Sequence, residues 1–229
     1  MWADNETKDD LLGYQVHADL LRDVVLDPKM LPISIGVFGD WGSGKSSLML
    51  LMQESIEKWR TETEEANKVG GAAKKNARVL QIMFNSWQFE DYEDTKLTLI
   101  ETILSDVIKD IEDHRDFFEK ADACLPKIKY LKLGVVILKN LARKIIPKEI
   151  QELLPNKEEW KEISKEDQDL LLDEVKEANS SLFIKRFRED FTQIIADGDY
   201  RSVVVYVDDL DRCSPKRIIQ CLEAVKLFV

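Results

Sequence analysis

The residues best suited to carry chemistry lie in one glycine-rich run, GDWGSGKSS, in the first quarter of the chain. Gly39, Gly42 and Gly44 permit left-handed backbone, so that successive N–H groups can close around an anion such as a phosphate. Lys45 adds a positive charge there, and the Ser46 hydroxyl is a ligand that Mg²⁺ accepts. A helix-periodic segment follows at once, and its N-terminus would point at the same phosphates. The run therefore predicts a phosphate-binding turn.

A second group of polar residues follows the most strand-like run of the chain, RSVVVYV. When a buried strand of a parallel sheet ends in a carboxylate, that group lies at the sheet edge where ligands bind. We expect Asp208 to hold Mg²⁺ through water, and Asp209 to take a proton from an attacking water. The alternative for Asp209 is that it only caps the loop. Asp211 and Arg212 either position water or contact a neighbouring subunit, or they pair with each other.

The elements that must position these residues alternate between strands and helices, which indicates an α/β fold. Apolar residues at helical spacing predict helices over 9–27, 46–66, 95–118 and 180–198. A last helix is predicted from Pro215, with Ser214 as its N-cap. Short apolar runs predict strands over 33–38, 78–84 and 201–207.

The amino-acid composition argues against several classes of protein. The chain has 229 residues, 44% of them hydrophobic, which is enough for a real core. Its formal charge of −11 argues against a nucleic-acid partner, because the phosphate backbone would repel it. Three cysteines and two distant histidines fit neither a disulfide scaffold nor a zinc site. With no signal peptide and no apolar run of membrane-spanning length, we expect a cytoplasmic protein.

Residues 119–180 differ from the rest and predict a helical insert. The part from Pro126 to Lys148 has seven basic and no acidic residues, and the part from Glu149 to Asn179 has eleven acidic and four basic ones. A helical hairpin with paired faces explains both blocks. A membrane surface bound by 127–148 is an alternative, peripheral to the inner face of the membrane, and nucleic acid is a weaker one.

Four stretches resemble the KAP family of P-loop NTPases: DLLGYQVHADLL, GDWGSGKSSL, FNSWQFED and VVYVDDLDRCSP. The resemblance implies a three-layer P-loop NTPase core with a parallel sheet and a helical insert between the Walker A and Walker B elements. The core would comprise residues 1–118 and 181–229, with the insert at 119–180. ATP and Mg²⁺ are the implied ligands. Many bacterial relatives belong to defence or membrane-associated systems, and members often carry transmembrane helices where this chain has 127–148.

In this fold class a further strand with a polar sensor residue lies between the first and third strands of the sheet, and an arginine comes later or from a neighbour. We expect both beyond Val229, and self-association or a partner protein through those same regions. The chain would then be the N-terminal portion of a longer protein.

Three aromatic or amide residues leave alternatives open. In similar NTPases the region of Tyr14 packs on adenine, so this ring would stack on the base, although a core tyrosine is the other reading. Trp41 either shields the phosphates or packs beside the sheet. Asn85 either orients a water or phosphate oxygen or caps a turn. The expected nucleotide-binding residues are Gly39, Asp40, Trp41, Gly42, Ser43, Gly44, Lys45, Ser46, Ser47 and Tyr14.

The function that these expectations describe is Mg-dependent ATP hydrolysis that drives a conformational switch. Lys45 and Asp209 are the expected catalytic residues, and Ser46 and Asp208 the expected metal ligands. The main alternative is an ATP-binding sensor or assembly switch with little hydrolysis. A small-molecule phosphotransferase and a structural adaptor are two further classes.

Overall fold

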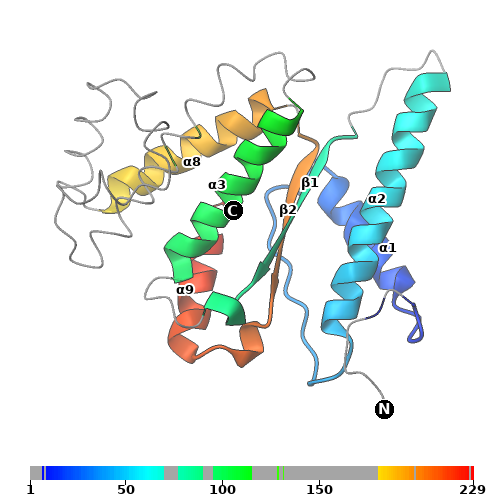
Figure 1. Ribbon diagram of the computed structural model, residues 1–229, viewed down its shortest axis with the longest axis horizontal. Coiled ribbons are helices and arrows are strands. Elements are labelled where there is room, and N and C mark those ends of the chain that lie inside the picture. Colours follow the sequence, from blue (N-terminus) through cyan, green and yellow to red (C-terminus); the bar gives the residue numbers. More distant parts are fainter. Residues whose placement is uncertain are drawn as a thin grey trace. The chain divides into compact units, whose positions relative to one another are not determined.

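The computed structural model describes residues 7, 9–69, 77–89, 95–114, 128, 131, 180–198, 200–226 and 228–229. Its elements are α1 (Gln15–Leu26), α2 (Lys45–Val69), β1 (Val79–Asn85), α3 (Thr95–Asp113), α8 (Ser180–Asp197), β2 (Ser202–Asp208) and α9 (Pro215–Val225), with short 3-10 turns at Trp87–Phe89 and Leu210–Arg212 (Figure 1). The predicted insert 119–180 lies outside the described residues, apart from Ile128, Leu131 and Ser180. A small parallel sheet of β1 and β2 makes this a mixed α/β fold.

The chain divides into two compact units. The first comprises 1–83, 199–208 and 229, and the second comprises 84–198 and 209–228. The first unit therefore holds α1, α2, the glycine-rich turn and β2. The second holds α3, α8 and α9. One boundary falls between the two adjacent acids Asp208 and Asp209.

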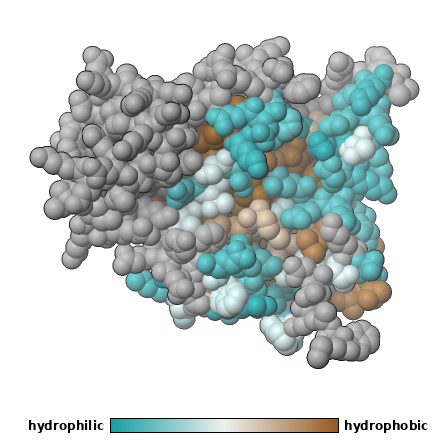
Figure 2. All heavy atoms as spheres, viewed as in Figure 1, coloured by the Kyte–Doolittle hydropathy of each residue, from teal (hydrophilic) through white to brown (hydrophobic). Residues whose placement is uncertain are grey.

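The core of the first unit lies among α1, α2 and β2. Its buried side chains are Ala18, Val25, Leu26, Leu51, Met52, Ile56, Val204 and Tyr206. Apolar residues on both faces of β2 are typical of a strand covered on both sides. The Tyr206 hydroxyl donates to Gln81 Oε1 at 2.7 Å and so ties β2 to β1. The C-terminal half of α2, with the sequence WRTETEEANK, is covered by hydrophilic residues (Figure 2).

The core of the second unit is built around α3. Buried residues recur along it at spacings of three and four, which is the period of one helix face. They include Leu99, Ile103, Leu104, Val107 and Ile111. Helix α9 packs against α3 with its buried Cys221 and Ala224. Arg217 Nη1 donates to Thr95 Oγ1 at 2.8 Å and joins the starts of these two helices.

The predicted strand over 33–38 is wrong for this structure, in which residues 33–40 have no regular secondary structure. Ile33, Ile35 and Val37 are each more than a third exposed. A strand exists only when a neighbour completes its hydrogen-bond ladder. In the described part of the chain only β1 and β2 form a sheet. The strand expected between this segment and β2 is supplied by no described residue, so the segment stays unpaired.

Candidate functional site

Each glycine of the glycine-rich turn has its own structural reason. Gly42 and Gly44 adopt φ of 77° and 85°, which is the left-handed region that other residues rarely enter. Gly39 lies against the side chain of Ser43, and a Cβ at Gly39 would push the Ser43 hydroxyl aside. The run GDWGSGKS matches the pattern G-x-x-x-x-G-K-[ST], which of the three glycines requires only Gly39 and Gly44. Gly42 is not required by the pattern, and the structure shows that it too adopts a left-handed backbone.

Lys45 is the first residue of α2, so the N–H groups at this point have no partner within the helix. Its ammonium group reaches back over the turn and donates to the carbonyl oxygens of Gly39 and Asp40 at 3.1 and 3.2 Å. Ser46 and Ser47 follow in the first helical turn, and the Ser47 hydroxyl accepts a hydrogen bond from Thr7 N–H at 3.3 Å. A positive charge and the positive end of a helix thus meet at one turn, which suits a phosphate group.

Tyr14 supports this turn from the segment before the helix. Its hydroxyl donates to the carbonyl oxygen of Ser43 at 2.8 Å. A Cβ on Gly44 would lie 3.0 Å from the Tyr14 ring and 3.2 Å from Leu12, so both side chains pack closely on that glycine. The structure therefore brings Tyr14 to the predicted phosphate site. Its predicted stacking on a base stays a prediction.

Two residues that contribute to this arrangement were missed by sequence reasoning, Asp10 and Leu12. The Asp10 carboxylate accepts from the N–H groups of Tyr14 at 2.7 Å and Gln15 at 2.9 Å. The hydrogen bonds from the Gln15 and Tyr14 amides lower the pKa of Asp10. An aspartate whose carboxylate accepts from backbone N–H groups a few residues later is a recognisable turn signal. Since the predicted helix began at residue 9, that signal went unused.

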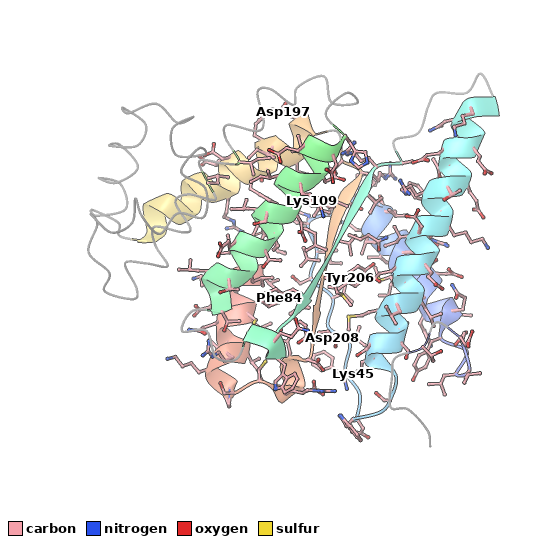
Figure 3. The ribbon with its side chains drawn as sticks, viewed as in Figure 1. Lys45, Phe84, Lys109, Asp197, Tyr206 and Asp208 are labelled. Atoms are coloured by element: carbon pink, nitrogen blue, oxygen red, sulfur yellow. The ribbon has the colours of Figure 1, made fainter. Side chains whose placement is uncertain are left out.

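Asp208 ends β2 in the same unit as the turn. Figure 3 shows Lys45 at the start of α2 and Asp208 at the end of β2, at the same end of that unit. Among the described residues no group of three or more His, Cys, Asp or Glu could hold a metal by itself. A nucleotide-bound Mg²⁺ needs no such group, because phosphates and waters supply most of its ligands. Ser46 and Asp208 thus remain the predicted ligands.

Asp209 begins the second unit, where its carboxylate is held by two donors. Asn85 Nδ2 donates to Oδ2 at 2.7 Å, and Arg212 Nε donates to Oδ1 at 2.8 Å. The backbone of Asp209 is left-handed, with φ of 56°, which no other non-glycine residue of the described ranges adopts. Its carbonyl oxygen accepts from Arg212 N–H at 3.2 Å and from the Cys213 thiol at 3.5 Å. Side chain and main chain are both held in place.

Asn85 also caps a turn. Its Oδ1 accepts from the N–H groups of Trp87 and Gln88 at 3.0 and 3.2 Å. Of the two alternatives for Asn85, the structure shows the cap and adds the bond to Asp209. Arg212 forms its ion pair with Asp209 rather than with its sequence neighbour Asp211, and its guanidinium lies 5.9 Å from the Trp87 ring centre. The polar residues after β1 and β2 therefore form one cluster.

Two further predictions concern Trp41 and the basic stretch 127–148. Trp41 is 73% exposed, so it does not pack beside the sheet in this structure. The basic stretch 127–148 lies outside the described residues except for Ile128 and Leu131, both buried. Across the described ranges, no helix is both long and apolar enough to cross a membrane.

Comparison with known proteins finds one matching family and similar stretches in two proteins. The P-loop domain of the KAP family matches residues 14–229. The chain is 34% identical over 61 residues to "Kinase D-interacting substrate of 220 kDa" of Rattus norvegicus, which covers 26% of this chain and 4% of that protein. It is 38% identical over 53 residues to the Homo sapiens protein of the same name, covering 23% of this chain and 3% of that one. No solved structure matches.

Proposed function

The chain belongs to the KAP family of P-loop NTPases, and from this premise we propose that it binds ATP with Mg²⁺ and hydrolyses the β–γ bond. The family indicates nucleotide binding and hydrolysis in general. The observation that carries the specific proposal is the turn 39–44. It combines two left-handed glycines, the folded-back Lys45 ammonium and the start of α2, with the acid of β2 in the same unit.

Each residue of the proposed site would have a distinct role in hydrolysis. The N–H groups of the turn and Lys45 bind the phosphate oxygens and stabilise charge as the γ-phosphoryl group transfers. Ser46 and Asp208 would hold Mg²⁺, which when bound neutralises charge on the β- and γ-phosphates. Asp209 takes a proton from the attacking water, whose oxygen bonds to the γ-phosphorus while the bridging oxygen leaves with ADP. Tyr14 holds the turn and would also face the base.

The glycine-rich turn would be one part of a conformational switch that nucleotide hydrolysis drives. We propose a three-layer P-loop core, in which hydrolysis changes a conformation that a partner protein or a second copy of the chain reads through regions outside these residues. A role in a bacterial defence or membrane-associated signalling system, with contact of 127–148 to a membrane, follows from family resemblance. The second candidate is an ATP sensor with little hydrolysis. The two donors on the Asp209 carboxylate favour it, because they occupy the predicted base.

Nucleotide binding and turnover test the proposal together. Calorimetry and phosphate release are measured with Mg·ATP on the wild type, Lys45→Ala, Asp209→Asn and Lys68→Ala. Lys68 is an exposed lysine near the far end of α2, about 35 Å along the helix from Lys45, and serves as the matched control. We expect Lys45→Ala to lose binding, Asp209→Asn to bind ATP but lose about 10²-fold or more in turnover, and Lys68→Ala to change neither.

Each alternative predicts another pattern. If the wild type binds ATP but releases phosphate no faster than Asp209→Asn, the sensor replaces the ATPase. If phosphate leaves only when a small hydroxyl acceptor is added, the protein is a phosphotransferase. If Lys45→Ala behaves as Lys68→Ala does, the turn is structural and the nucleotide site does not exist.

A further inference from the structure

We infer that Asn85 and Arg212 are positioning residues for Asp209, with Asn85 as a fixed guide and Arg212 as a counter-charge that must leave before Asp209 can take a proton. The inference rests on the proposed role of Asp209 in water activation and adds its regulation. It is carried by a cluster within the second unit, where the two carboxylate oxygens of Asp209 have different donors.

Asn85 is suited to be the fixed member because a flip of its side-chain amide would break its hydrogen bonds. Its Oδ1 accepts from two backbone N–H groups, of Trp87 and Gln88, so Nδ2 is the atom that faces Asp209. The residue is part-buried at the end of β1, and its bond to Asp209 links points 124 residues apart. A neutral donor held in this way directs one carboxylate oxygen and leaves the charge of the acid in place.

Arg212 is suited to be the removable member. Its side chain is 48% exposed, whereas that of Asp209 is 16% exposed. It sits three residues beyond Asp209 at the end of a short 3-10 turn, and it has one carboxylate partner and one ring face in the structure. The guanidinium occupies Oδ1 of Asp209, so an attacking water must compete with Arg212 for that hydrogen-bond acceptor. Because its guanidinium side is half-exposed, water can replace Arg212 when this ion pair opens.

The backbone at Asp209 supports a functional reading of the cluster. A left-handed aspartate is uncommon, and it persists because the Asp209 carbonyl and carboxylate are both bonded. Such conformations occur mainly where a side chain must be aimed. Here the conformation aims the carboxylate at Asn85 while Arg212 folds back onto it.

The test is a kinetic cycle on the intact protein, measuring kcat and KM for Mg·ATP with thermal unfolding as a check on folding. We expect Arg212→Gln to raise kcat about two- to fivefold and to leave KM unchanged. This is the factor expected when the free energy of one half-exposed ion pair no longer opposes the reaction. Arg212→Lys keeps the charge and should stay closer to the wild type. Asn85→Asp keeps the acceptor that caps the turn, but replaces the donor to Asp209 by a second carboxylate. It should lower kcat about tenfold or more, because one hydrogen bond to a charged group is lost and two carboxylates are brought together.

Gln88→Ala is the matched control, since Gln88 joins the cap through its backbone and its side chain is exposed. In the Asp209→Asn background the effects of Asn85→Asp and Arg212→Gln should vanish, because both act through that carboxylate. If they persist in the residual turnover of that background, while Asp209→Asn alone lowers turnover about 10²-fold, the inference fails and the ATPase proposal stands. An unchanged or lower kcat in Arg212→Gln also overturns the inference. If Asp209→Asn turns over at the wild-type rate, the water-activating role fails and takes the inference with it.

Discussion

The hydroxyl of Tyr14 donates a 2.8 Å hydrogen bond to the carbonyl oxygen of Ser43, and so ties the start of α1 to the glycine-rich turn 29 residues later. The same ring lies against Gly44, where a Cβ would meet it at 3.0 Å. The turn that we propose for phosphate binding is therefore supported by residues that precede it in sequence. A change at Tyr14 is therefore expected to reach the turn.

Replacing Tyr14 separates support of the turn from stacking on a base. Tyr14→Phe keeps the ring but loses the hydrogen bond to Ser43, which should weaken Mg·ATP binding about three- to tenfold, the size of one net hydrogen bond. Tyr14→Leu loses ring and hydroxyl and should weaken it further. Calorimetry on both variants checks this. Wild-type affinity in Tyr14→Phe together with a large loss in Tyr14→Leu would assign the residue to base stacking alone.

The turn glycines should differ from an equally left-handed glycine outside the turn. Gly44→Ala is strained by φ of 85° and also crowds Tyr14 and Leu12, so both stability and Mg·ATP binding should fall. Gly13→Ala is the matched control, because its φ is 73° and a Cβ there meets nothing within 4 Å. It should lower the free energy of unfolding by about 1–2 kcal/mol and keep most of the affinity. Equal losses of affinity in both variants would contradict a specific role for Gly44.

Alkaline unfolding should report on Tyr206. Burial raises the pKa of Tyr206 above its ordinary value of 10.0, so folding favours the neutral phenol. Its contribution to stability is then complete below about pH 10 and is lost as pH rises from there toward the raised value. Tyr206→Phe should be about 1–2 kcal/mol less stable at pH 8, because Gln81 Oε1 loses its donor, yet its stability should fall less between about pH 9.5 and 11. Urea melts across that range make the comparison, and parallel pH curves would refute it.

Hydrogen exchange should distinguish the segment 33–38 from β2. The segment has no regular structure, so its amides should exchange rapidly, whereas those of 203–207 in β2 should be protected. Mass spectrometry of peptides from each segment is the measurement. Protection of 33–38 equal to that of β2 would mean that a strand pairs with this segment in solution.

Local patterns in the sequence were enough for part of this fold. The glycine pattern and the apolar run after it placed the start of α2 within one residue, and the valine run placed Asp208 at the end of β2. The family resemblance is confirmed by the match over 14–229. The strand over 33–38 failed because strand formation depends on a neighbour far away in sequence. The start of α1 was misplaced because the Asp10 carboxylate ends the preceding turn at Tyr14, while apolar spacing continues through Leu11 and Leu12.

Local chemistry was enough to predict a glycine-rich turn before a helix and an acid at the end of a strand, and the structure has both. That the turn binds phosphate stays a prediction. That Asn85 and Arg212 both bond to Asp209 could not be foreseen, because Asn85 lies 124 residues from Asp209 and only the folded chain brings them together. Likewise the two candidate acids for Arg212, Asp209 and Asp211, lie only two residues apart, which spacing alone does not resolve.

The unpaired apolar segment beside the glycine-rich turn has a practical consequence for anyone handling the protein. Ile33, Ile35 and Val37 alternate along extended chain, and in the described residues β2 has a sheet neighbour on one side only. Open strand edges near exposed apolar side chains recruit other molecules by edge-to-edge pairing. Concentrated samples should accordingly tend to precipitate, and a charged residue such as Lys in place of Ile35 should improve their yield.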